Sequence, residues 1–244
     1  MAATPGGEES VYDSGRLSLL DLVLEKNRAQ NKKQLVHRLV YVSKIRPEVA
    51  DRRDIGEHYE RLFKNSPANG EAVSGLLLIY PVHIVHVLES SANVLHEVIN
   101  DLVEEEQSIS GMLQSTKILV YTGDISNRLY SQWCFRALNL SSARMQEYTT
   151  NETVDVAVME GLTLVLKLGE YLSKLPKISL SKTMDMLPEK APDLLLRQDL
   201  IEYLINNKEL SSPSQYLKRY NKPVDVVLDS ELVWPMQTPL LPVI

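Results

Sequence analysis

The chain has 244 residues and a formal net charge of −6, with acidic residues spread along its length, so no broad basic surface invites nucleic acid. Its composition, 44% hydrophobic and 24% charged, is that of a globular protein and excludes wholesale disorder. A single cysteine, Cys134, excludes intramolecular disulfides and any zinc site built on cysteine.

The N-terminal segment MAATPGGEES lacks the basic-then-apolar pattern of a signal peptide. The longest apolar stretch, residues 73–87, contains Pro81 and two histidines and is too short to span a bilayer. We therefore expect a cytoplasmic protein without a membrane segment.

Residues 1–34 are expected to form a flexible tail followed by a helix. The helical periodicity covers residues 16–30 and places Leu17, Leu20 and Leu24 on one stripe. This helix is expected either to cap the edge of its own domain or to dock on a partner. In the second case the three leucines are partner-binding residues.

The central block, residues 35–140, has the rhythm of an α+β domain, in which extended apolar runs alternate with amphipathic segments. Both helices are expected on one face of the sheet, and the β-α-β-β-α-β order is the ferredoxin-like arrangement. The expected elements are strands at 35–43, 72–80, 82–89 and 117–121, a helix at 48–64, and a helix that begins after Ser91 and carries Val94 to Leu102.

The remaining residues, 141–244, are expected to form a helical extension and a Pro-rich tail. Residues 153–174 and 193–206 carry apolar side chains at helical spacing, whereas residues 176–192 are broken and polar. Residues 213–244 are predicted to be irregular.

The hydrophobic, proline-punctuated end of the chain is expected either to pack back along the domain or to bind a groove elsewhere. Its candidate partner-binding residues are Trp234, Leu240 and Leu241.

Several segments of the central block stand in the order found in BLUF domains, the blue-light-sensing flavin modules. They are residues 37–43 (HRLVYVS), 74–78 (SGLLL), 87–89 (VLE) and 123–130 (GDISNRLY), which leads to Trp133. The resemblance implies a BLUF-type fold. It also implies a flavin pocket beneath a first-strand tyrosine, Tyr41, together with His86 and Trp133.

The chain departs from the BLUF pattern at the positions that serve the flavin. His86 replaces the glutamine whose amide is the proposed light switch, and an imidazole has one donor and one acceptor at fixed ring positions. Ala68 stands near the position of an asparagine that would hold the flavin edge, and Phe135 replaces a methionine. Glutamates 104–106 stand where relatives place basic residues near the phosphates. The resemblance therefore implies that the photochemistry is lost.

Each candidate residue also has a structural interpretation. Period-two alternation places His86 on the helix-covered face, where histidine is more often a core residue than a ligand. Tyr41 fits a packed strand aromatic, and Cys134 fits a buried small apolar side chain. His83 lacks a carboxylate partner at an obvious spacing, and no pair of histidines has the spacing of metal ligands. We expect no metal site.

No P-loop lysine follows the glycines of residues 70–75, and no Gly-x-Ser-x-Gly elbow occurs, so we expect no enzyme. The BLUF-like block with its extension, including residues 229–235 (DSELVWP), resembles the testis-expressed protein 47 family. This resemblance implies expression in male germ cells and a structural or adaptor role.

We therefore expect a non-catalytic protein-interaction module without a cofactor. Its expected partners are axonemal or other germ-cell assembly proteins, in the cytoplasm and the sperm flagellum. The alternative is a sensor domain that binds FAD without the usual photocycle.

Overall fold

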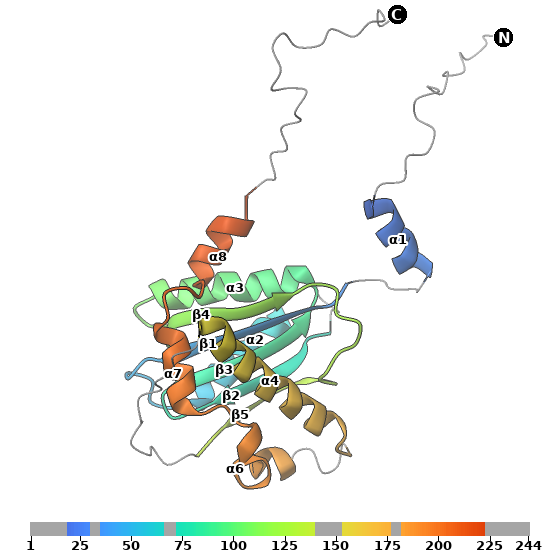
Figure 1. Cartoon of the computed structure of the whole chain (residues 1–244). Coiled ribbons are helices and arrows are strands. Elements are labelled where there is room, and N and C mark those ends of the chain that lie inside the picture. Colours follow the sequence, from blue (N-terminus) through green and yellow to red (C-terminus); the bar gives the residue numbers. More distant parts are fainter. Residues whose placement is uncertain (1–18, 30–34, 66–71, 140–152, 177–181, 223–244) are drawn as a thin grey trace, which may run out of the picture.

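A computed structural model describes residues 19–29, 35–65, 72–139, 153–176 and 182–222 (Figure 1). The central block contains β1 (His37–Ile45), α2 (Arg53–Asn65), β2 (Ser74–Ile79), β3 (His83–Ser90), α3 (Ala92–Gln107), β4 (Leu113–Thr122) and β5 (Trp133–Ala137). The first six elements have the predicted β-α-β-β-α-β order, so the α+β, ferredoxin-like fold class is confirmed.

The five strands form one sheet in the order β4-β1-β3-β2-β5. β1 is antiparallel to β3 and β4, β2 is antiparallel to β3, and β5 adds to the edge of β2 in parallel. The sequence did not predict β5, because a run of five half-buried residues has no clear alternation. This register pairs Tyr41 with His86 on neighbouring strands.

One face of the sheet is covered by α2 and α3, as predicted. The side chain of Ser91 caps α3 by accepting a hydrogen bond from Val94 N at 3.4 Å. The buried positions of α3 then recur every three or four residues and meet the sheet: Val94, Leu95, Val98, Ile99 and Leu102. Full burial of an aliphatic side chain of this size contributes about 1.5–3 kcal/mol.

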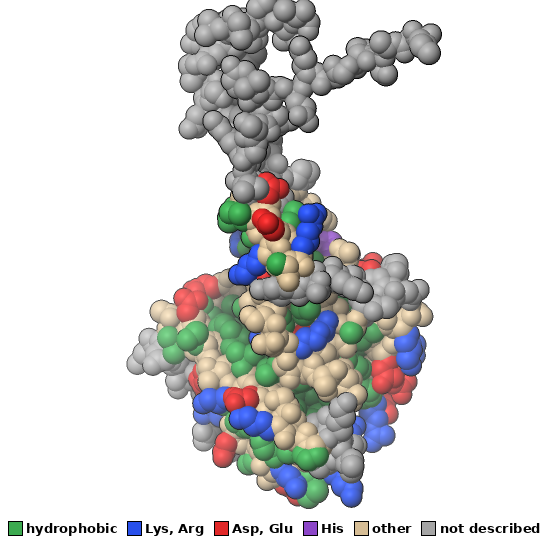
Figure 2. All heavy atoms as spheres, turned by 90° about the vertical axis from the view of Figure 1, so that its right-hand side faces the viewer, with side chains coloured by type: hydrophobic (Ala, Val, Ile, Leu, Met, Phe, Trp, Pro, Cys, Tyr) green, Lys and Arg blue, Asp and Glu red, His purple; other side chains and the backbone are tan. Residues whose placement is uncertain are grey.

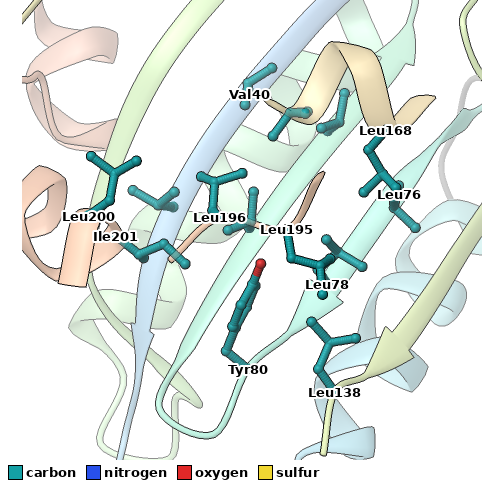
Figure 3. Close-up of a cluster of buried hydrophobic side chains, with 14 of the residues drawn as sticks. Val40, Leu76, Leu78, Tyr80, Leu138, Leu168, Leu195, Leu196, Leu200 and Ile201 are labelled. Atoms are coloured by element: carbon teal, nitrogen blue, oxygen red, sulfur yellow. The ribbon is translucent and has the colours of Figure 1, made fainter. Parts of the chain in front are cut away.

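The opposite face is covered by α4 (Val154–Ser173) and α7 (Gln198–Asn206), which lie in front of the sheet in Figure 1. Figure 3 shows their leucines meeting the strand side chains in one cluster. The labelled members are Val40, Leu76, Leu78 and Tyr80 of the sheet segment, Leu138, and Leu168, Leu195, Leu196, Leu200 and Ile201 of the extension. The extension therefore supplies the second covering layer of the sheet.

Two helix boundaries differ from the expectation. α2 begins at Arg53 rather than near residue 48, because the carboxylate of Asp51 accepts the backbone N–H of Arg53 at 2.9 Å and caps the first turn. α7 begins at Gln198 rather than at residue 193, and a short 3₁₀ turn, Pro192–Leu194, precedes it.

Two stretches read as irregular are partly helical. α8 (Pro213–Tyr220) starts with a capping box in which Ser212 and Gln215 exchange hydrogen bonds, and Pro213 occupies the first turn, where proline is tolerated. The expectation of irregular structure there was wrong. Residues 176–192, expected to be broken and polar, include α6 (Leu187–Lys190) and bury the side chains of Met184 and Leu187.

α1 (Leu19–Ala29) lies apart from the sheet in Figure 1, and Figure 2 shows its hydrophobic and charged side chains together at the surface. Leu24 and Leu19 are exposed, Leu19 by 78%. Leu17 lies outside the described residues, as do Trp234, Leu240 and Leu241. The helix at Leu20 is described, but its side chain is not. In the described part of the chain, no helix combines the length and the apolar character needed to cross a membrane.

Candidate functional site

The fold brings the three predicted pocket residues together. Tyr41 on β1 and His86 on β3 are register partners, and the hydroxyl oxygen of Tyr41 lies 2.6 Å from His86 Nδ1. Trp133, the first residue of β5, places its indole Nε1 at 2.9 Å from His86 Nε2. His86 thus stands between the two other residues and contacts both.

The hydrogen bonds fix the tautomer of His86. The indole N–H of Trp133 can only donate, so Nε2 of His86 accepts. A neutral imidazole then carries its proton on Nδ1, which donates to the hydroxyl oxygen of Tyr41. That hydroxyl in turn donates to the hydroxyl of Tyr59, at 2.8 Å. Along this chain of bonds from Trp133 to Tyr59, both ring nitrogens of His86 and the hydroxyl of Tyr41 are bonded to protein side chains.

Burial keeps the side chains of this network uncharged. His86, Tyr41 and Tyr59 have no exposed surface. Loss of hydration lowers the pKa of His86 to about 3, so its imidazole is neutral at physiological pH. Burial also raises the pKa of both tyrosines, which remain protonated.

Aromatic rings fill the space between α2 and the sheet beside this network. The ring of Tyr59 lies 4.7 Å from that of His86, and the ring of Phe63 lies 5.2 Å from that of Trp133. Gly56 of α2 packs directly on Phe135 of β5, so a Cβ atom there would lie only 2.3 Å from that ring. The helix therefore rests on the sheet in this region.

A salt bridge joins α2 to α3 on the same face. His58 Nε2 lies 2.9 Å from the nearer carboxylate oxygen of Asp101. The hydrogen bond to Asp101 raises the pKa of His58, although partial burial acts in the opposite direction. The two helices that cover the site are thus linked to each other as well as to the sheet.

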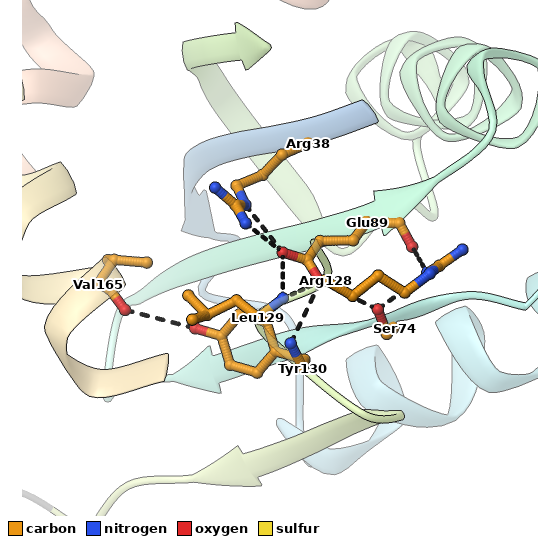
Figure 4. Close-up of polar contacts among 7 residues, drawn as sticks. All are labelled: Arg38, Ser74, Glu89, Arg128, Leu129, Tyr130 and Val165. Atoms are coloured by element: carbon orange, nitrogen blue, oxygen red, sulfur yellow. Dashed lines mark hydrogen bonds and ion pairs between the residues drawn. The ribbon is translucent and has the colours of Figure 1, made fainter. Parts of the chain in front are cut away.

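A buried carboxylate anchors the segment that leads to Trp133. Glu89, at the end of β3, has no exposed surface and pairs with Arg38, whose Nη2 lies 2.6 Å from Oε1 (Figure 4). The backbone N–H groups of Leu129 and Tyr130 donate to the same carboxylate, at 2.9 and 3.2 Å to Oε2. Glu89 therefore holds the residues just before β5 on the sheet, which positions Trp133 for its bond to His86.

The acidic run 104–106 has a structural role that the sequence did not reveal. Glu105 accepts the backbone N–H of Met112, and Glu106 accepts that of Thr116, each at 2.6 Å. A cation also stands here: Arg46 donates from all three guanidinium nitrogens to five carbonyl oxygens at the end of α3 and in the following segment. Since a guanidinium has five N–H donors, none remains for a phosphate.

With these contacts, the described residues do not fit a flavin. Both nitrogens of His86 are bonded to protein side chains, and the rings of Tyr59 and Phe63 pack beside it. The donors of Arg46 are used within the fold. Ala68, the remaining predicted departure, lies outside the described residues.

His83, which has no carboxylate at an obvious spacing in the sequence, has a carboxylate partner in the fold. Its Nε2 contacts Glu202 of α7, more than a hundred residues away in sequence, which is why spacing could not reveal the pair. Burial lowers the pKa of His83, so the neutral ring donates from Nε2 to the carboxylate. Glu202 also accepts from Lys44 Nζ at 3.0 Å.

Cys134 packs half-buried beside the leucine cluster, and burial raises the pKa of its thiol, so it lacks the character of a nucleophile. Within the described segments, no three His, Cys, Asp or Glu side chains gather as a metal site would require. The residue that sequence reasoning missed is Tyr59. Its place on the buried stripe of a helix was a signal, because a buried tyrosine hydroxyl needs a partner.

The five-stranded sheet, the two helices on one face and the placement of Tyr41, His86 and Trp133 define a ferredoxin-like α+β fold of the BLUF type. The chain belongs to the testis-expressed protein 47 family, whose model matches residues 35–222.

Solved BLUF proteins are similar to the chain in fold. BlrB, a BLUF protein in its dark state, is 19% identical over 43% of this chain and 73% of its own, with a TM-score of 0.31. Photo-activated BlsA is 15% identical over 71% of this chain and 97% of its own, with a TM-score of 0.34. A bacterial light-regulated adenylyl cyclase is 16% identical over 62% of this chain, with a TM-score of 0.35, and the match spans 40% of that enzyme.

Proposed function

We propose that this chain is a non-catalytic protein-interaction module, a structural adaptor built on a BLUF-type domain that has lost its flavin photochemistry. The observation that carries the proposal is the continuous hydrogen-bond chain of Trp133, His86, Tyr41 and Tyr59, which uses both nitrogens of His86. A BLUF switch requires an amide that exchanges partners with a flavin, and here a buried neutral imidazole is bonded at both nitrogens.

The outer surfaces support an interaction role. Val156, Met159 and Leu166 of α4 expose apolar side chains on the side away from the sheet, Met159 by 66%. α1 exposes further leucines. Apolar groups that recur on exposed helix faces are typical of sites for other proteins.

The family description places its members among proteins expressed in testis. We propose that the chain acts in the cytoplasm of male germ cells, with axonemal or other assembly proteins of the sperm flagellum as partners. Deletion of residues 234–244 should weaken recruitment of those partners from testis extract while the central domain stays folded. Unchanged recruitment would remove the tail from the contact surface.

The decisive experiment is an absorbance spectrum of the freshly purified chain, followed by thermal denaturation with excess FAD, FMN or riboflavin. We expect no flavin absorption and no shift of the melting temperature. A ligand at one hundred times its Kd would stabilise the fold by about 2.7 kcal/mol, which the melt would detect. A yellow protein would overturn the proposal and favour the FAD-binding sensor.

The variant His86→Gln is the matched test, since it restores the amide and leaves the rest of the site unchanged. We expect it to remain colourless, because the aromatic rings between α2 and the sheet are still present. Flavin binding by this variant would show that the imidazole of His86 alone excludes the cofactor, so that a single residue accounts for the loss of flavin binding.

A further inference from the structure

A groove runs between α8, β4 and the first two turns of α3, away from the pocket of His86. Its cavity has a volume of about 250 Å³. Small-molecule sites are mostly about 300–1,000 Å³, so the groove is better suited to a few residues of a peptide than to a nucleotide. Its lining includes His96 of α3, Tyr121 of β4, and Tyr216, Leu217 and Tyr220 of α8.

Three tyrosines form a row along this groove. The ring centroids of Tyr121 and Tyr216 lie 5.9 Å apart, and those of Tyr216 and Tyr220 lie 4.7 Å apart. Tyr220 ends the row and is 64% exposed. Rows of aromatic rings with polar edges are the surface on which proline-rich segments dock, because the rings pack on prolines and the hydroxyls donate to free backbone carbonyls.

The chain itself carries such a segment. Residues 239–242 read Pro-Leu-Leu-Pro, within the sequence WPMQTPLLPVI of residues 234–244. A polyproline II helix has three residues per turn, so Pro239 and Pro242 stand on one edge. Leu240 and Leu241 then stand on the other two edges.

Reach and charge favour this occupant. The tail begins just after Asn221, which lines the groove, and the 18 residues from there to Pro239 can extend about 60 Å. The intervening acidic residues are Asp225, Asp229 and Glu231, without a lysine or arginine between residues 223 and 244. The end of α8 is basic, with Lys218 and Arg219 in its last turn and Lys222 after it. The acidic residues thus follow this basic turn within nine residues, and their attraction to it favours a tail that stays near α8.

We propose that residues 239–242 dock as a polyproline II segment in the tyrosine groove of their own chain. This rests on the proposed function, because it names the surface on which the tail is held while Leu240 and Leu241 face outward for a partner. Attachment to α8 raises the effective concentration of the segment to the millimolar range, so even a weak contact is populated.

The test measures binding of a fluorescein-labelled peptide of residues 234–244 to the full chain by anisotropy. In the unmodified chain the groove is already filled. In the full chain with Pro239→Ala and Pro242→Ala the groove is vacated, and we expect the peptide to bind at least about tenfold more tightly. Adding Tyr220→Ala to that chain should weaken binding by about tenfold, as for an exposed aromatic anchor.

Met159→Ala, on the outer side of α4, is the matched control and should leave peptide binding unchanged. Equal affinity for the unmodified and the proline-substituted chains, or no binding to either, would overturn the docking. A dimer of the unmodified chain that dissociates on proline substitution would assign the segment to a second copy, and would also overturn it. These outcomes are independent of the flavin spectrum, which tests the proposed function alone.

Discussion

The two faces of the sheet each bury a histidine of β3, and they hold the two side chains differently. His86 faces α2 and is bonded at both nitrogens, to Tyr41 and Trp133. His83 faces α7, and its Nε2 contacts Glu202, while its Nδ1 has no hydrogen-bond partner among the described residues. One ring is fully satisfied and the other is bonded at one nitrogen.

The two histidines differ in where their partners come from. On one face the partners belong to the central block, and on the other face they belong to the helical extension. The partners of His86 come from β1 and β5, within the ferredoxin-like block. The partner of His83 comes from α7, and the same carboxylate binds Lys44 of β1. The first network closes the site of the BLUF-type fold, whereas the second attaches the helical extension to that fold.

The largest effect is expected from removing the buried carboxylate of Glu89, which holds Leu129 and Tyr130 on the sheet face that α4 covers. Glu89→Ala leaves the guanidinium of Arg38 and two backbone N–H groups without their carboxylate, and breaking a buried pair in this way costs about 3–5 kcal/mol. Urea denaturation would measure the loss. Glu170→Ala, which removes a fully exposed pair with Lys174, should leave the unfolding midpoint unchanged. A midpoint for Glu89→Ala equal to that of the control would contradict the anchoring role.

The next effect is a pH dependence from His86. The pKa of the buried ring is about 3, against about 6.5 in the unfolded chain, so the unfolded state binds more protons as the pH falls below 6.5. The free energy of unfolding should therefore fall by about 2 kcal/mol between pH 7 and pH 5. His86→Gln removes this dependence, and melting curves at several pH values would detect the flatter profile.

Two other histidines, His83 and His58, also have shifted pKa values and contribute to the pH dependence of the free energy of unfolding. The pKa of His83 is also lowered by burial, so it adds to the loss at acid pH. His58 has the opposite sign: its raised pKa gives stability that is present at low pH and lost as the pH rises through that pKa. His58→Asn should therefore steepen the acid loss. Equal pH profiles for the unmodified chain and for His86→Gln would mean that the ring of His86 is not buried as a neutral imidazole.

The sequence predicted the parts of the fold that depend on local pattern. The apolar runs gave four of the five strands, and Ser91 gave the start of α3. β5 and α8 were missed for local reasons. β5 is short and half-buried, and Pro213 begins a helix rather than ending regular structure.

For the site, the sequence predicted which residues come together in the pocket, but it did not predict the hydrogen-bond partners that come from distant parts of the chain. Alternation and the BLUF resemblance placed His86 beside Tyr41, and the bonds between them were found. The partners of His83 and of Arg46 lie far along the chain, and no spacing rule connects residues that only the packed fold brings together. The acidic run 104–106 was interpreted from the sequence only as a departure from the phosphate site, whereas the carboxylate of Glu105 accepts a backbone N–H in the fold.

A smaller effect is expected on the α7 side. Partial burial opposes ionisation of Glu202, but hydrogen bonds from His83 and Lys44 outweigh it and lower its pKa to about 2, so the carboxylate stays charged between pH 7 and pH 5. Glu202→Gln should cost only about 1 kcal/mol, because the side chain is partly solvated. Hydrogen exchange should rise in α7 and stay unchanged in β1 and β3. Faster exchange throughout the sheet would show that the contacts of Glu202 with His83 and Lys44 support the whole fold.

The smallest effect is expected on the outer side of α4. Met159→Gln exchanges an exposed apolar side chain for a polar one of similar length, so the free energy of unfolding should change by less than about 0.5 kcal/mol. Because the fold is unaffected, a fall in partner recruitment by this variant can only come from the surface. Gly161→Gln, on the buried side of the same helix, would instead disrupt the packing against Leu196. It should lower the free energy of unfolding and reduce recruitment for that reason. Recruitment that follows stability in both variants would exclude the α4 surface as a binding site, whereas loss in Met159→Gln alone would locate one there.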